Sequence, residues 1–181
     1  TDVVVHAGKV LSTFYQCGDG YRLDPYTLEQ FGTESWVPLD GISAHPKVDE
    51  ETGELLFFNY STHAPYMHYG VVGPDNKLKH YIPIPLPGPR LPHDMAYTKN
   101  YSIFADLPLF WDADALAKGR HATRFHRPLP SRFPPVPRYR SPHTLTLLQP
   151  DPSHVRHRMQ ASQAGERLHH AASFRYQPVP G

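Results

Sequence analysis

The sequence predicts an all-β protein in which short antiparallel strands follow one another as β-meanders. Residues 1 to about 112 alternate between runs rich in Val, Ile, Tyr and Phe and clusters of Gly, Pro, Asp, Asn and Lys, which is the pattern of strands separated by turns. Over this range no segment shows a capped apolar pattern of helical period, and only Asp112–Lys118 is expected to form a short helix. Meanders of this kind build propeller blades and up-and-down barrels.

The expected strands also repeat in order along the chain. Four strands between Ile42 and Ile84 lead into a proline-rich crossover, Pro83–Pro92, after which the cycle starts again at His93. His45 and His93 hold equivalent places in the two cycles and lie 48 residues apart, within the length of one propeller blade. With an earlier cycle before residue 32, the chain is expected to hold about two and a half blades. The expected strands are Val3–Val5, Val10–Gln16, Tyr21–Asp24, Leu28–Phe31, Ile42–Val48, Leu55–Tyr60, Tyr66–Val72, Leu78–Ile84, His93–Tyr97 and Tyr101–Leu107.

Bulk composition excludes several classes of protein. The 181 residues carry a net charge of +1, which gives no global field to attract nucleic acid or anionic lipid. No apolar stretch approaches the roughly 18 residues that a membrane-spanning helix needs. The single cysteine, Cys17, rules out an intrachain disulfide framework. The chain begins in a strand-like run without a signal-peptide pattern, so we expect an internal piece of a longer, cytoplasmic protein.

His45 and His93 are the residues of this repeat that could carry chemistry. Each is expected on the first strand of its blade, and the first strands of a propeller line its central channel. Two imidazoles that point to one axis could share an ion, and imidazole suits Fe, Zn, Cu or Ni better than Mg or Ca. The alternative is that each ring is a lone, partly buried side chain, since the chain has 13 histidines and coincidence is easy.

The residues around these two histidines resemble known motifs. Ser43–Asp49 (SAHPKVD), followed by Glu51–Leu55 (ETGEL), is similar to the first metal-histidine motif of the carotenoid cleavage oxygenases, and Leu91–Thr98 (LPHDMAYT) is similar to the second. The resemblance covers residues 1 to about 139 and keeps the family's order. Four further segments match it: Tyr21–Pro25, Pro83–Pro89, Asp106–Leu109 and Leu129–Phe133.

The resemblance implies a seven-bladed propeller with Fe(II) on its axis, bound by four histidines from different blades. His45 and His93 match the first two ligands. The implied reaction inserts dioxygen across a double bond of an apolar conjugated substrate and gives two carbonyl products; the chemistry belongs largely to the metal. Thr1 matches a threonine that lines the vacant side of the iron.

Gln16 departs from the family pattern. An acidic residue near this position typically accepts a hydrogen bond from a ligand histidine, which fixes the tautomer of the ring. A glutamine carbonyl can accept the same bond without charge, so we expect Gln16 to support the His93 ring and to retain metal less well. A solvent-facing glutamine is the alternative. For a third ligand the candidates are His169 and His170, whose context matches the family only faintly.

The chain is therefore expected to divide into a partial propeller, residues 1–139, and a tail, residues 140–181, that is rich in Pro, His and Arg and is disordered or unrelated to the family. The expected function is a non-haem Fe(II) dioxygenase that cleaves a carotenoid or apocarotenoid, with a stilbenoid as the alternative substrate. No nucleic-acid partner is expected, and peripheral membrane contact is expected only of full-length relatives. Two other readings stay open: an inert fragment that lacks two iron ligands, and a Zn-binding β-module completed by a tail histidine.

Overall fold

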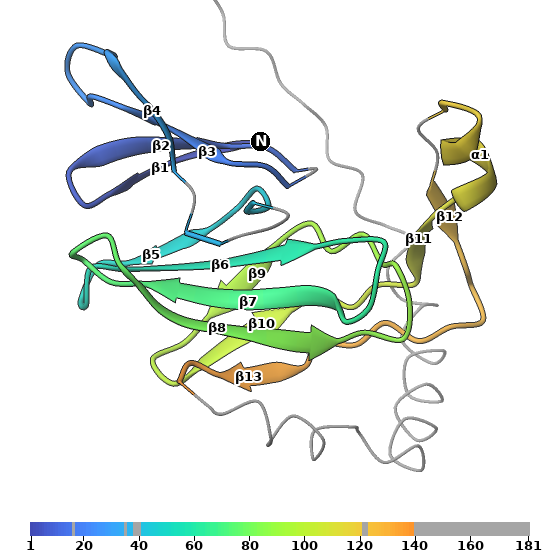
Figure 1. Ribbon diagram of the computed structural model, residues 1–181. Helices are drawn as coiled ribbons and strands as arrows, with labels where there is room; N and C mark the ends of the chain where they lie inside the picture. The colour runs from blue at the N-terminus through green and yellow to red at the C-terminus, as the bar shows by residue number, and fades with distance from the viewer. Residues whose placement is uncertain (16, 35, 38–40, 121–122, 140–181) are drawn as a thin grey trace, which may run out of the picture. The chain divides into compact units, whose positions relative to one another are not determined.

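The computed structural model describes residues 1–15, 17–34, 36–37, 41–120 and 123–139. Antiparallel sheets dominate this part of the chain, as Figure 1 shows. The predicted short helix is present as α1 (Ala113–Ala117). Within the described ranges, no helix has the length and apolar character that a membrane crossing requires.

The first sheet is a four-stranded meander whose strands pair in chain order. Its first hairpin turns at Ala7 and Gly8, which both have positive φ (48° and 73°), as the two central residues of a type I′ turn require. One face of this sheet is covered, and the other exposes Val3 and Val5 to solvent. The strands are β1 (Asp2–His6), β2 (Lys9–Thr13), β3 (Gly20–Leu23) and β4 (Gln30–Glu34).

The second sheet has the same strand order but is buried on both faces. All residues of its strand β6 are buried, and because successive side chains of a strand point to opposite faces, β6 needs apolar partners on both sides. Leu55 and Phe57 pack on one side with Leu11 of the first sheet, while Leu56 and Phe58 pack on the other side with Phe104. The strands are β5 (Lys47–Asp49), β6 (Glu54–Tyr60), β7 (Tyr66–Val72) and β8 (Leu78–Pro85).

The third sheet is partial and contains a strand that the sequence pattern did not predict. Its order is β13-β10-β9, so its third strand comes from Pro135–Pro137 after a long excursion of the chain. That excursion carries α1 and a second unpredicted feature, the hairpin of β11 with β12 (Figure 1). The strands are β9 (Met95–Tyr97), β10 (Tyr101–Phe104), β11 (Leu109–Trp111), β12 (Thr123–Phe125) and β13 (Pro135–Pro137).

Two apolar cores join the three sheets. Residues of the second sheet belong to both cores: one includes Leu11 of β2, and the other includes Phe104 of β10 and Val136 of β13. The second sheet therefore packs against the first on one face and against the third on the other. Two complete meanders and one partial sheet confirm the predicted two and a half blades.

Candidate metal centre

His45 and His93 come together although they belong to different sheets. Each lies shortly before the first strand of its sheet: His45 precedes β5, and His93 precedes β9. The two ring centroids are 4.9 Å apart, with an angle of 68° between the planes. The first strands of the three sheets are also neighbours, since β1 contacts β5 and β5 contacts β9. The equivalent places in successive blades therefore converge, as the 48-residue repeat predicted.

One detail of that prediction is wrong, because neither histidine lies within a strand. β5 begins at Lys47 and β9 at Met95, so both imidazoles sit on the segments that lead into the strands. Proline accounts for the late start of β5, since Pro46 follows His45 and has no N–H to give to a ladder. His45 itself has a φ of 61°, a left-handed conformation that is uncommon for a residue other than glycine.

A carboxylate that the sequence pattern did not reveal contacts His45. Asp2, on β1, places its Oδ2 atom 3.1 Å from Nδ1 of His45, across 43 residues of sequence. Both side chains are partly exposed, 25% for His45 and 31% for Asp2. The sequence offers one indication of this contact: Asp2 follows Thr1, the residue that the family resemblance places beside the metal, at the start of a first strand.

An ion pair also links the two histidine segments. Lys47 follows His45 by two residues, Asp94 follows His93 directly, and Lys47 Nζ lies 2.7 Å from Asp94 Oδ1. Partial burial acts to raise the pKa of Asp94, but the hydrogen bonds from Lys47 and from the Met95 N–H outweigh it, so the pKa is lowered. The segments are thus joined by opposite charges a few residues from the imidazoles.

The remaining predicted site residues are Thr1, Gln16, His169 and His170. Thr1 is described and exposed, and its proposed position beside a metal stays a prediction. Gln16, His169 and His170 lie outside the described residues, so their predicted roles also stay predictions.

The donors that are present fit a transition metal in part. Two imidazoles at this separation match the ligands that Fe, Zn, Cu and Ni accept, and they do not suit Mg or Ca. Among the described residues there is no group of three His, Cys, Asp or Glu side chains that could hold a metal ion. The described part of the chain therefore brings two imidazoles together, which are fewer ligands than the predicted metal site would need.

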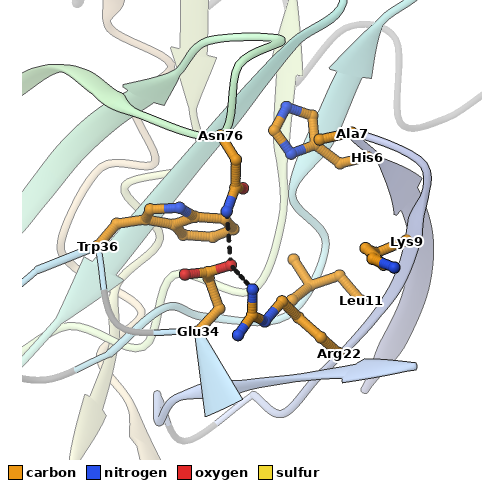
Figure 2. Close-up of a pocket in the computed structure, with 8 residues that line it drawn as sticks. All are labelled: His6, Ala7, Lys9, Leu11, Arg22, Glu34, Trp36 and Asn76. Atoms are coloured by element: carbon orange, nitrogen blue, oxygen red, sulfur yellow. Dashed lines mark hydrogen bonds and ion pairs between the residues drawn. The ribbon is translucent and has the colours of Figure 1, made fainter. Parts of the chain in front are cut away.

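The structure also contains a pocket of about 220 Å³, and neither His45 nor His93 lines it. Glu34 accepts a hydrogen bond from Asn76 Nδ2 at 2.7 Å and pairs with Arg22 Nη1 at 3.2 Å (Figure 2). Burial lowers the pKa of His6, so this ring is neutral near pH 7. The polar contacts tie the first sheet to the β7–β8 turn. The pocket is lined by His6, Ala7, Lys9, Leu11, Arg22, Glu34, Trp36 and Asn76.

Comparison with known proteins decides the family. A family model described as retinal pigment epithelial membrane protein matches residues 1–178. The chain belongs to this family, that of the carotenoid cleavage oxygenases. The match includes residues beyond 139, and the predicted division of the chain near that position stays a prediction.

Several members of the carotenoid cleavage oxygenase family are similar in sequence or structure. A carotenoid 9,10(9',10')-cleavage dioxygenase of Pisum sativum is 42% identical over 98 residues, which cover 54% of this chain and 18% of that protein. An isoeugenol monooxygenase of Pseudomonas nitroreducens is 39% identical over 114 residues, covering 60% of this chain and 24% of the relative. The crystal structure of a lignostilbene dioxygenase of Pseudomonas brassicacearum superimposes with a TM-score of 0.68 at 32% identity, covering 75% of this chain and 29% of that one.

The chain thus spans less than a third of each of these relatives. The sheets described above correspond to part of the β-propeller of the carotenoid cleavage oxygenases. Both expectations drawn from the sequence motifs, the family and the fold class, are confirmed.

Proposed function

We propose that this chain contributes to a non-haem Fe(II) dioxygenase that cleaves a conjugated carbon–carbon double bond of a carotenoid or apocarotenoid into two carbonyl products. His45 and His93 supply two of the iron ligands, and the other ligands come from outside the described residues. The observation that carries the proposal is the 4.9 Å separation of the two rings, which arrive from the leading segments of successive sheets in a family of cleavage dioxygenases.

The protein's own part in this chemistry is to bind and orient. Bound ferrous iron would supply a centre that can activate dioxygen beside an apolar alkene. Neutral imidazoles add no negative charge, so a site built from them leaves the metal cationic. His45 and His93 would hold the metal from two neighbouring segments, and the packed second sheet behind β5 holds the backbone that carries His45.

Substrate class is the finer part of the proposal. The similar proteins are named for cleavage of carotenoids, for isoeugenol and for lignostilbenes, and all three names belong to unsaturated substrates. Carotenoids and apocarotenoids come first because the relative with 42% identity is a carotenoid dioxygenase, and a stilbenoid is the alternative. Incubation with one substrate of each class under oxygen, followed by mass spectrometry of the carbonyl products, separates them. Cytoplasmic residence completes the proposal for this chain, and peripheral contact with a membrane to collect the apolar substrate is proposed only of full-length relatives.

The metal part is tested by ligand substitution. We expect Fe(II), added anaerobically, to broaden the ring C–H resonances of His45 and His93 in NMR spectra of the chain, and we expect His45→Ala or His93→Ala to weaken binding at least about tenfold. The matched control is His63→Ala, which removes an exposed loop histidine and is expected to leave binding unchanged. Iron binding that is equal in all four proteins contradicts the proposal.

A second function is favoured by one observation, the lack of a third ligand near the pair within the described residues. The isolated chain would then be catalytically inert and would hold metal weakly, whatever the activity of the longer relatives. Iron binding without product from any of the three substrate classes supports this reading. A competition between Fe(II) and Zn(II) addresses the remaining possibility, a zinc-binding module.

A further inference from the structure

The contact between Asp2 and His45 has a chemical consequence for the ligand atom. A neutral imidazole carries one N–H, and the nitrogen without the hydrogen holds the lone pair that a metal can use. An ionised carboxylate can only accept hydrogen bonds. With Asp2 Oδ2 at 3.1 Å from Nδ1 of His45, the hydrogen belongs on Nδ1 and the lone pair on Nε2.

The Asp2 carboxylate is held in place from its own strand. Its Oδ1 accepts the backbone N–H of Val3 at 2.8 Å, which leaves Oδ2 free to face the imidazole. The backbone of Asp2 is paired in register with Thr13 of β2. The two oxygens thus have separate partners, one on β1 and one on the segment before β5.

The imidazole is constrained from its side as well. His45 has a left-handed backbone, with a φ of 61°, and it is followed by the rigid Pro46. Residues held in such sparsely populated conformations persist where the surroundings determine them, and they cluster at functional sites. A fixed backbone and a fixed Nδ1 contact together leave the ring little freedom to turn.

We propose that Asp2 is a positioning residue for His45: its carboxylate selects the tautomer protonated at Nδ1, so that Nε2 is the atom that binds metal. This inference rests on the proposed function for the role of His45 as a ligand, but the tautomer is a property of the metal-free chain. Outer carboxylates of this kind typically change metal affinity about 10- to 100-fold when they are removed.

The alternative explanation is that the contact between Asp2 and His45 is only a structural ion pair with no effect on the tautomer or on metal binding. Partly exposed pairs contribute little to stability, so Asp2→Ala should shift the melting temperature by no more than about 3 °C whether or not Asp2 has this role. Stability therefore does not distinguish the two explanations, whereas the protonation site of the ring and the metal affinity do.

The experiment uses the 181-residue chain labelled with 15N-histidine, with His45 assigned by comparison with His45→Ala. Long-range 1H–15N correlation reports which ring nitrogen carries the hydrogen, first without metal and then during an anaerobic Fe(II) titration. The variants are Asp2→Ala, Asp2→Asn and the control Asp19→Ala, which removes an exposed aspartate to which the described part of the structure assigns no hydrogen bond or ion pair.

We expect His45 to be protonated at Nδ1 in the parent and in Asp19→Ala. Asp2→Ala should shift the hydrogen toward Nε2 and weaken Fe(II) binding about 10- to 100-fold, and Asp2→Asn should lie between, because its amide oxygen can still accept the bond. Unchanged tautomer or unchanged iron affinity in Asp2→Ala overturns this inference. If instead His45→Ala itself leaves iron binding intact, the proposed function fails, and the metal-free tautomer still reports on the Asp2 contact.

Discussion

The first and second sheets share one topology and differ in what covers them. Both are four-stranded meanders, but β6, the second strand of its sheet, is buried along its whole length, whereas the corresponding strand of the first sheet, β2, has two buried residues among five. The second sheet lies between two cores, and the first is covered on one face. The difference shows that equivalent strands can contribute very unequally to stability, because the neighbouring sheet, not the strand itself, supplies the burial.

The sharpest way to break this comparison is to shorten one aromatic side chain in each sheet. Phe57 in β6 is 0% exposed, and its ring lies over the cross-strand partner Gly70, where an added Cβ would come within 2.3 Å of the ring. We expect Phe57→Ala to lower the free energy of unfolding by about 4 kcal/mol, since it removes a buried ring and leaves a cavity. Urea denaturation followed by circular dichroism measures the loss.

The matched control is Phe31→Ala in β4. Phe31 is 38% exposed, and its ring has Lys9 Nζ 3.8 Å from its centroid, so the loss should be no more than about 1 kcal/mol. Similar losses in the two variants would mean that the first sheet is covered as well as the second, contrary to the burial described here.

The parts of the fold that depend on local sequence patterns were predictable. Turn residues and β-branched runs predicted the order of the strands, and β7 begins and ends at the predicted residues, Tyr66 and Val72. The third strand of the last sheet was not predictable, because β13 consists of Pro135, Val136 and Pro137, and prolines argue against a strand in the sequence. Only pairing with β10, more than 30 residues earlier, makes it one.

The pairing of the two histidines in the candidate site was predictable, and the residues that contact them were not. His45 and His93 could be found because a repeat places equivalent residues at equivalent depths. Asp2 and Lys47 have no such signal, because their contacts depend on how neighbouring sheets meet and on side-chain direction. Long-range polar contacts between sheets are the part of a site that the periodicity of one sequence does not encode.

A second prediction compares an ion pair at the second sheet with one within the first. Arg138 Nη1 lies 2.6 Å from Asp49 Oδ2, and the Arg138 side chain is 3% exposed. We expect Arg138→Met to lower the free energy of unfolding by about 2 kcal/mol at pH 7, because it leaves a carboxylate without its charged donor. Arg22→Met, which breaks the pair with Glu34 within the first sheet, should cost less than about 1 kcal/mol, since Arg22 is 32% exposed.

The effect of Arg138→Met should depend on pH. The hydrogen bond from Arg138 is the main cause that lowers the pKa of Asp49 below its ordinary 3.8. A carboxyl whose pKa is lowered by folding stabilises the protein above its ordinary pKa, and this contribution is lost as the pH falls through the lowered value. The stability difference between parent and Arg138→Met should therefore be largest near neutral pH and shrink below about pH 4. A difference that stays constant down to pH 2 would show that Arg138 acts through packing and not through its charge.

The smallest expected effect on stability is at the ion pair between Lys47 and Asp94. The side chains are 27% and 57% exposed, so Lys47→Met should change the free energy of unfolding by less than about 1 kcal/mol, and the change should diminish further in high salt. The pair nevertheless joins the segments that carry His45 and His93, so its removal should let the two rings move apart more readily. We expect Lys47→Met to weaken Fe(II) binding several-fold while the melting temperature stays within about 3 °C of the parent.

The exchange Lys47→Asp with Asp94→Lys restores the attraction with reversed charges, and it should recover most of the binding if the link between the segments is what matters. Failure of the exchanged pair to recover binding, with the fold intact, would assign the loss to the individual charges near the imidazoles.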